Sequence, residues 1–302
     1  MSPGVSGAHG GGMIRGVLRR NAGWVWVSPW IVGLTVFFLI PMAMSLYYSL
    51  TDYNMLEAPL RVGLSNYASI LRDELFWKAV RNTLVYAGVS IPLTALVSMA
   101  IAGLLDVDTR LSGVVRLFVF TPTVVPLVAA AMIWMWLFNS DAGLINAGLG
   151  AVGIQGPNWL QQQGWAMAAL ILMNLWSVGQ AVVIYLGALQ DIPETLYEAG
   201  ELDGMGPIRR FVHIALPGIA HAVVFNSIIQ TITAWQVFAT PFIMTEGGPN
   251  RSTYFYSHYL YDNAFLFQRM GYASALGWVQ TVLIAACALV PWRFARRLWS
   301  TR

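Results

Sequence analysis

Apolar residues form six long runs along the chain, and short polar segments separate them. Each run is long enough to cross a bilayer as a helix, which takes about 20 residues at a rise of about 1.5 Å per residue. The runs lie at residues 24–50, 83–105, 113–138, 165–189, 218–244 and 273–292. This pattern predicts an all-α polytopic membrane protein with six transmembrane helices. It also predicts an N-terminal tail at 1–23, a membrane domain at 24–297 and a C-terminal tail at 298–302.

Prolines interrupt several of these runs. A broken helix is tolerated in a membrane where neighbouring helices or a water-filled cavity satisfy the backbone groups that the break frees. The prolines are Pro29, Pro41, Pro92, Pro122, Pro126 and Pro241. They are compatible with a transport pathway and equally with ordinary kinked helices, so they do not decide the function alone.

Basic residues between the runs orient the chain. Six spans, an even number, place both termini on the same side. That side carries 11 arginines, which are Arg15, Arg19, Arg20, Arg110, Arg116, Arg209, Arg210, Arg293, Arg296, Arg297 and Arg302. The opposite side carries 6 basic residues, which are Arg61, Arg72, Lys78, Arg81, Arg251 and Arg269. Because basic residues accumulate on the cytoplasmic side, both termini are predicted to be cytoplasmic.

The N-terminal region has two distinct parts. The first thirteen residues are rich in Gly and Ser, so the N-terminal tail is expected to be partly disordered. No small-residue cleavage site follows the first apolar run, which is therefore predicted to be a retained helix rather than a signal peptide.

The composition excludes several classes of protein. Hydrophobic residues make up 57% of the chain and charged residues only 10%, against about 25% charged residues in soluble domains. Lys78 is the sole lysine, so no basic patch supports nucleic-acid binding. The single cysteine, Cys287, excludes an intrachain disulfide and a cysteine-based metal site. The apolar runs contain no cluster of His, Asp, Glu, Ser or Cys that predicts a catalytic or metal site.

The 14 Asp and Glu residues all lie outside the six runs. A proton-coupled carrier usually needs carboxylates or His relays inside the membrane, so this distribution argues against one. A sodium site built from carbonyl oxygens remains open. The chain also lacks the phosphate-binding pattern G-x-x-x-x-G-K-[ST], because its lysine lies in the sequence FWKAV. Energy for uphill transport would therefore come from a partner, and a passive channel fits the same observations.

The segment at 190–217 carries five carboxylates and two arginines between long apolar runs. Asp191 is predicted to cap a short helix, with Pro193 near its start and Glu194 three residues after the cap. Apolar residues then recur at helical spacing on one face, at Ile192, Leu196, Ala199 and Leu202. Helices that lie on lipid headgroups usually carry Lys or Arg on their polar face. This helix carries Glu and Asp instead, which favours docking onto another protein.

The same segment resembles the cytoplasmic signature of the membrane permeases of ABC importers. That signature reads Glu-Ala-Ala, three residues, Gly, nine residues and Ile-x-Leu-Pro. Here Glu198-Ala199-Gly200 is followed after three residues by Gly204, and after nine more by Ile214-Ala215-Leu216-Pro217. Gly200 in place of Ala is the one departure at the fixed positions. It is expected to loosen the helix slightly and to leave docking possible.

Two further segments are similar to the carbohydrate-uptake branch of this family, and in particular to the larger permease of maltose-type importers. Residues 63–83 resemble its first external segment, and residues 245–275 resemble its last external loop. The matching positions in that loop are Gly247-Gly248-Pro249, Tyr259, Tyr261, Ala264-Phe265 and Gly271-Tyr272. The resemblance extends over residues 24–297.

The resemblance implies the type I fold of ABC importer permeases, in a bacterial or archaeal plasma membrane. A second, similar permease and two ATPase subunits would be partners, and an extracytoplasmic sugar-binding protein would dock at Gly247, Gly248 and Pro249. No cofactor is expected on this chain, because the ATPase subunits would bind ATP and Mg²⁺. The loop helix would transmit their closure through Glu198, Ala199, Gly200, Asp203 and Gly204.

The implied solute is a sugar, in particular a di- or oligosaccharide, with a glycerol-3-phosphate-like solute as an alternative. Uncharged amides and hydroxyls exchange hydrogen bonds with sugar hydroxyls, and an aromatic ring stacks on a sugar face. Such residues lie in the fourth and fifth runs at Asn174, Gln180, Gln230, Thr233, Trp235 and Gln236. They are the predicted pathway residues, and Trp235 and Gln236 match the family's substrate-lining region. Interhelical hydrogen bonding is the alternative role.

Overall fold

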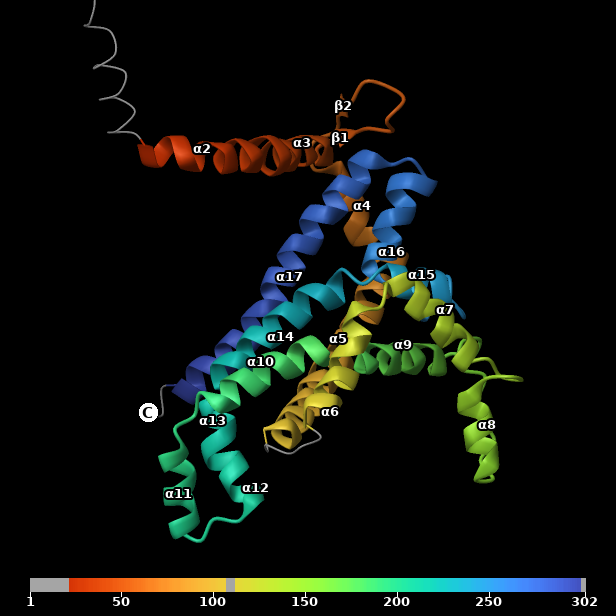
Figure 1. Cartoon of the computed structure of the whole chain (residues 1–302). Helices are drawn as coiled ribbons and strands as arrows, with labels where there is room; N and C mark the ends of the chain where they lie inside the picture. Colours follow the sequence, from red (N-terminus) through yellow and green to blue (C-terminus); the bar gives the residue numbers. More distant parts are fainter. Residues whose placement is uncertain (1–21, 107–111, 300–302) are drawn as a thin grey trace, which may run out of the picture.

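The computed structural model describes residues 22–106 and 112–299, which form a helical assembly with one two-stranded sheet (Figure 1). Most of the predicted N-terminal and C-terminal tails lies outside these residues. Three helical segments are long and apolar enough to cross a membrane without a sharp bend: Trp26–Ser49, Glu74–Leu105 and Met270–Arg293. They belong to α2 (Ala22–Leu34), η1 (Thr35–Leu39) and α3 (Ile40–Ser49), to α5 (Glu74–Leu105), and to α17 (Met270–Trp299).

Three further candidate spans are each divided into two bent halves, and the third of them, at 207–235, begins before the predicted run 218–244. The bends are 103° before α7, 49° between α9 and α10, and 69° before α14. The elements are α6 (Ser112–Phe120), η2 (Thr121–Val124), α7 (Leu127–Leu137), α9 (Trp165–Trp176), α10 (Gly179–Gln190), α12 (Pro207–Arg210), η3 (Phe211–Ala215), α13 (Leu216–Gly218) and α14 (Ala220–Trp235). Counting each bent pair as one span gives up to six spans in the described residues.

The bends have local causes that hydropathy does not reveal. Pro122 and Pro126 flank the sharpest bend, where each proline removes a backbone donor. At the start of α10, Gly179 packs so closely on α6 that a Cβ would lie 2.6 Å from the carbonyl oxygen of Val119. The predicted run 218–244 is also divided, because α14 ends at Trp235 and α15 (Ala239–Met244) follows.

The centre of the molecule is formed by α5, α10, α14 and α17. α5 packs against α10 and α14, and α17 packs against α14 and α3 (Figure 1). By contrast, α2 extends away from this centre (Figure 1), and its Trp24 and Trp26 side chains are 71% and 85% exposed. Lipid or another chain would have to cover these apolar rings.

Short elements gather where α5 begins. They are β1 (Thr51–Asp52), its antiparallel partner β2 (Leu60–Arg61), α4 (Ser65–Arg72), α16 (Tyr256–Tyr261) and η4 (Asp262–Leu266). Asp73 joins them, since its Oδ1 accepts a hydrogen bond from the Leu75 N–H (2.8 Å) and its Oδ2 accepts one from the Tyr259 hydroxyl (2.6 Å). The Tyr259 hydroxyl also lies 2.9 Å from that of Tyr272 on α17. This network fixes the start of α5, a helix that lines the cavity described next.

Candidate functional site

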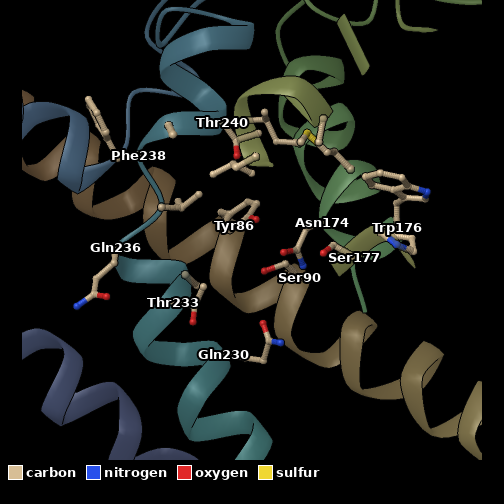
Figure 2. Close-up of a pocket in the computed structure, with 18 of the residues that line it drawn as sticks. Tyr86, Ser90, Asn174, Trp176, Ser177, Gln230, Thr233, Gln236, Phe238 and Thr240 are labelled. Carbon is tan, nitrogen blue, oxygen red and sulfur yellow. The ribbon is translucent and has the colours of Figure 1, made fainter. Parts of the chain in front are cut away.

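A cavity of about 600 Å³ opens among α5, α9, α14 and the segment around η2 (Figure 2). Its aromatic lining comes from Tyr86, Trp176 and Phe238. The polar side chains at its wall are Ser90, Thr123, Asn174, Ser177, Gln230, Thr233, Gln236 and Thr240. Among the described residues that line it, none is Asp, Glu, Lys, Arg or His. The cavity therefore offers neutral donors, neutral acceptors and ring faces.

Four of the six predicted pathway residues line this cavity. Asn174 reaches it from α9, and Gln230, Thr233 and Gln236 reach it from α14 and its C-terminal end. Figure 2 shows Asn174 and Ser90 close together, whereas the Gln236 side chain points away from them. The amide Nδ2 of Asn174 donates a hydrogen bond to Thr94 Oγ1 on α5 (3.1 Å). Asn174 therefore both lines the cavity and bonds to a neighbouring helix.

The other two predicted pathway residues, Gln180 and Trp235, do not line the cavity. Gln180 is exposed in the first turn of α10 and does not line the cavity. Trp235 is 1% exposed, and its ring meets that of Tyr256 at a tilt of 63° with the ring centres 5.8 Å apart. It belongs to a packed cluster of α5, α16 and α17 residues rather than to the cavity wall.

Sequence reasoning missed the contribution of α5 to the cavity. Tyr86 and Ser90 line it, and Thr94 lies one turn further along the same helix. Ser90, Thr94 and Ser98 recur every four residues and are all buried, which places them on one face of α5. This spacing of hydroxyls inside an apolar run is the feature of the sequence that could have identified the contribution of α5.

The second candidate site is the loop at 190–217, which contains α11 (Glu194–Leu202) and lies at the opposite end of the molecule from β1 and β2 (Figure 1). The prediction that Asp191 caps this helix is wrong. Asp191 follows the last turn of α10, and its N–H donates to the carbonyl of Gly187 (3.2 Å). Pro193 occupies the cap position of α11 without a side-chain hydrogen bond.

The C-terminal end of α11 is closed by a glycine turn. Gly204 has φ +70°, its N–H donates to the Glu201 carbonyl (3.0 Å), and the Met205 N–H donates to the Gly200 carbonyl (2.8 Å). This pair of hydrogen bonds is the Schellman arrangement, which favours glycine at the position of positive φ. Gly200 itself is buried, and a Cβ there would lie 2.8 Å from Cδ1 of Ile214.

The apolar face of α11 is only partly covered by the chain. Ile192 and Tyr197 pack against the core around α10, whereas Leu196 is 51% and Leu202 is 90% exposed. Of the five predicted coupling residues, four are exposed and Gly200 is buried. An exposed apolar face of this kind on a short helix suits a protein partner.

Electrostatic contacts tie the loop to neighbouring helix ends. Burial raises the pKa of Asp106, just after α5, and the nearby Arg116 guanidinium opposes this by lowering it. Burial also raises the pKa of the Tyr197 hydroxyl, and the Asp106 carboxylate adds to that rise. Within the loop, Arg210 Nη1 lies 3.5 Å from Glu201 Oε2. Tyr197 also packs against the cluster that contains Leu105, the last residue of α5.

The third predicted site, Gly247-Gly248-Pro249, shapes a tight loop between α15 and α16, next to the first turns of α5. Gly247 is buried with φ +78°, and a Cβ there would lie 2.9 Å from the Tyr254 ring. The Gly248 N–H donates to the Thr245 carbonyl (2.8 Å), and the Lys78 amino group donates to the Asn250 carbonyl (2.7 Å). The glycines and the proline therefore set the backbone path, and the exposed side chains of the loop belong to Glu246, Asn250 and Arg251.

His258 lies beneath this loop with restricted access to solvent. Burial lowers the pKa of its imidazole, and the Asp262 carboxylate, whose Oδ1 is 3.9 Å from Nε2, opposes the shift. Rings of Tyr254 and Phe242 flank it, with centres 4.7 Å and 5.2 Å away. Among the described residues, however, the buried Nδ1 of His258 has no hydrogen-bond partner.

Comparisons with known proteins find similarity over most of the chain. The family described as binding-protein-dependent transport system inner membrane component matches residues 79–298. The probable ABC transporter permease protein YesP of Bacillus subtilis (strain 168) is 36% identical over 282 residues, which cover 91% of each chain. The lactose transport system permease protein LacF of Rhizobium radiobacter is 32% identical, over 91% of this chain and 94% of LacF.

A solved structure shares the fold. It is that of a bacterial alginate ABC transporter in complex with an alginate pentasaccharide-bound periplasmic protein, and one of its chains matches with a TM-score of 0.80 at 21% identity. The match covers 93% of this chain and 96% of the other. At this identity the likeness shows a shared fold.

Proposed function

We propose that this chain, which belongs to the family of binding-protein-dependent transport system inner membrane components, forms one half of the passage of an ATP-driven importer and carries a sugar. Its relatives are transporter permease subunits rather than enzymes. ATP hydrolysis is accordingly assigned to partner ATPase subunits, and the passage is completed by a second, similar permease.

The observation that supports a sugar is the uncharged cavity. A sugar hydroxyl needs both a donor and an acceptor, and the side chains of Asn174, Gln230 and Ser90 supply both within one cavity. Its volume of about 600 Å³ lies in the range typical of small-molecule sites, roughly 300–1,000 Å³. A di- or oligosaccharide is the solute that this lining fits.

A glycerol-3-phosphate-like solute fits the cavity less well. An anion that leaves water for a site of low polarity is costly unless a cation or several directed donors compensate. The part of the cavity that the described residues line contains no Lys, Arg or His. A neutral sugar is therefore favoured over a phosphorylated solute.

In the proposed topology each bent pair forms one span, which gives six spans with both termini in the cytoplasm. The segment 190–206 then lies on the cytoplasmic side, where α11 contacts an ATPase subunit through Glu198, Ala199, Asp203 and Gly204. The loop at 245–251 lies on the opposite side, where it faces a sugar-binding protein. The distribution of loop arginines supports this orientation.

The packing of the loop suggests how a partner's movement reaches the cavity. A Cβ at Gly218 would lie 2.6 Å from Cδ1 of Ile192, so the start of the loop and the turn before α14 are in close contact. Gly200 makes a similarly close contact with Ile214 on η3. Through these contacts a displacement of α11 would reach the base of α14, and the other end of α14 lines the cavity.

The experiment is uptake into liposomes that contain the complete importer, with its binding protein outside and ATP inside. We expect ATP-dependent accumulation of a labelled neutral di- or oligosaccharide, tested with lactose, maltose and diacetylchitobiose, and no accumulation of labelled glycerol-3-phosphate. Accumulation of glycerol-3-phosphate without any of the sugars would contradict the proposed solute class. Equilibration of a sugar without ATP or partners would instead indicate a passive channel.

A further inference from the structure

A stripe of buried polar side chains continues below the cavity toward the loop at 190–217. On α5 it consists of Ser90, Thr94 and Ser98, which are 3%, 2% and 0% exposed. On α14 it consists of Gln230, which lines the cavity, and of Asn226 one turn nearer the loop. The two helices pack against each other, so the stripe forms a polar seam between them.

The seam is closed in this structure. Just below the cavity, Thr94, Ala181, Tyr185, Asn226 and Gln230 surround a narrow void that leaves no volume for a water molecule. Gln230 borders both this void and the cavity above it. The void and the cavity therefore share Gln230 as a wall residue.

Asn226 has an unusual environment for an amide. It is 4% exposed, and the Tyr185 hydroxyl is its polar neighbour. Among the described residues, however, no acceptor meets the distance and angle of a hydrogen bond with its Nδ2. A buried donor without a well-formed hydrogen bond is destabilising and rare in folded proteins. Ser98 and Ser227, by contrast, satisfy their hydroxyls on backbone carbonyls of their own helices.

Three helices surround this void, and two of them, α10 and α14, are connected by the loop at 190–217. Tyr185 lies on α10, which ends at Gln190, and Asn226 lies on α14, which begins at Ala220. A movement of α11 therefore acts through the chain itself on the separation of Tyr185 and Asn226. Such a separation would open the void and connect it to the cavity.

We propose that Asn226, with Thr94 and Tyr185, forms a second contact site for an uncharged polyhydroxyl solute, below the cavity and closed in the state seen here. This inference rests on the proposed function and adds a residue and a location to it. When α10 and α14 separate, the unsatisfied N–H of Asn226 donates to a passing hydroxyl. The group is neutral, so the site discriminates against a charged solute, which would lose its hydration without gaining a counter-ion.

A purely structural role makes different predictions. If the Asn226 amide only bridges helices, as amides often do in membranes, it stays inaccessible during transport and its loss lowers stability. If it contacts solute, it becomes accessible during turnover. Its replacement by an apolar residue of similar size then leaves stability unchanged or higher, because an unsatisfied donor is removed.

The first test is accessibility of a cysteine at this position in the complete importer. In a Cys287→Ala background, which removes the native thiol, Asn226→Cys is treated with a hydrophilic methanethiosulfonate reagent. We expect labelling at least about tenfold faster with ATP and sugar-loaded binding protein than without ATP, because turnover exposes a residue that is protected at rest. Val224→Cys is the matched control, since it is similarly buried but lines an apolar groove on another face of α14.

The second test measures transport by Asn226→Leu. We expect disaccharide uptake to fall about fivefold, the effect of one lost hydrogen bond, while assembly and thermal stability are retained. Asn226→Gln, which keeps the amide, should recover part of the uptake. The inference is overturned if the Asn226→Cys variant is not labelled during turnover in an importer that transports sugar, or if Asn226→Leu transports at the wild-type rate. Failure of the proposed function would look different, because the wild-type importer itself would then show no ATP-dependent sugar uptake.

Discussion

Replacing Leu202 with glutamate is expected to leave this chain folded and to reduce ATP-driven uptake at least about thirtyfold, the effect of losing a contact worth about 2 kcal/mol or more at the centre of an interface. Leu202 is 90% exposed at the end of α11, so the chain's own packing does not depend on it. The proposed role of α11 is to bury this side chain in an ATPase subunit. Glutamate would place an unpaired charge in that contact.

The control for this prediction is a leucine of similar exposure on the opposite side of the molecule. Leu60 on β2 is 66% exposed, and Leu60→Glu should not change copurification of the ATPase subunits. We would compare the amount of ATPase that copurifies with each variant, together with sugar uptake. Normal copurification and uptake with Leu202→Glu would remove α11 from the coupling mechanism.

Replacing Trp235 with alanine is expected to destabilise the protein by about 3–5 kcal/mol, as for other large aromatic residues in cores. Trp235 is 1% exposed and packs edge-on against Tyr256, and residues around it come from α5, α16 and α17. Its truncation would leave a cavity where these helices meet. Trp235→Phe should retain much of the lost stability.

The measurement is thermal unfolding of the purified importer, combined with uptake per folded complex. Gln236→Ala is the matched control, because Gln236 is the adjacent residue and is exposed at the cavity rim. If Trp235→Ala unfolds at the wild-type temperature and yet fails to transport, then Trp235 contacts solute and our assignment of it to packing is wrong.

Hydropathy predicted the number and position of the apolar segments better than their shape. The unbroken helices α5 and α17 contain the predicted runs 83–105 and 273–292. A long apolar segment that forms one unbroken helix can be placed from hydropathy alone. The bend between α9 and α10 falls at Ser177 and Val178, within a run that contains no proline. Both halves of such a pair are apolar, so hydropathy cannot show where the chain bends. The close contact of Gly179 with α6 joins residues that are far apart in the sequence, so the local pattern does not reveal it.

The candidate sites were predictable to different degrees. The position of the loop helix followed from the spacing of Glu198, Gly204 and Pro217, which is a local pattern. The start of that helix did not, because α10 continues to Gln190 and Asp191 therefore ends one helix instead of beginning the next. The pathway residues on α14 could be placed on one face by their three-residue spacing. Trp235, one position from Gln236, faces differently, because successive residues on a helix are rotated by about 100°.

The most direct test of the central claim, that solute passes through the uncharged cavity, is uptake by Ser90→Trp. Ser90 is 3% exposed and borders the cavity with its side chain toward Asn174 (Figure 2), so a tryptophan there would have to extend into the passage. Ser69→Trp, at an exposed position on α4, is the control.

We would measure sugar uptake and ATP hydrolysis side by side in liposomes that contain the complete importer. We expect Ser90→Trp to reduce disaccharide uptake at least about tenfold, equivalent to about 1.4 kcal/mol, while ATP hydrolysis and assembly continue. Wild-type uptake by a correctly assembled Ser90→Trp importer would contradict the claim, because the sugar would then have to pass along a different surface.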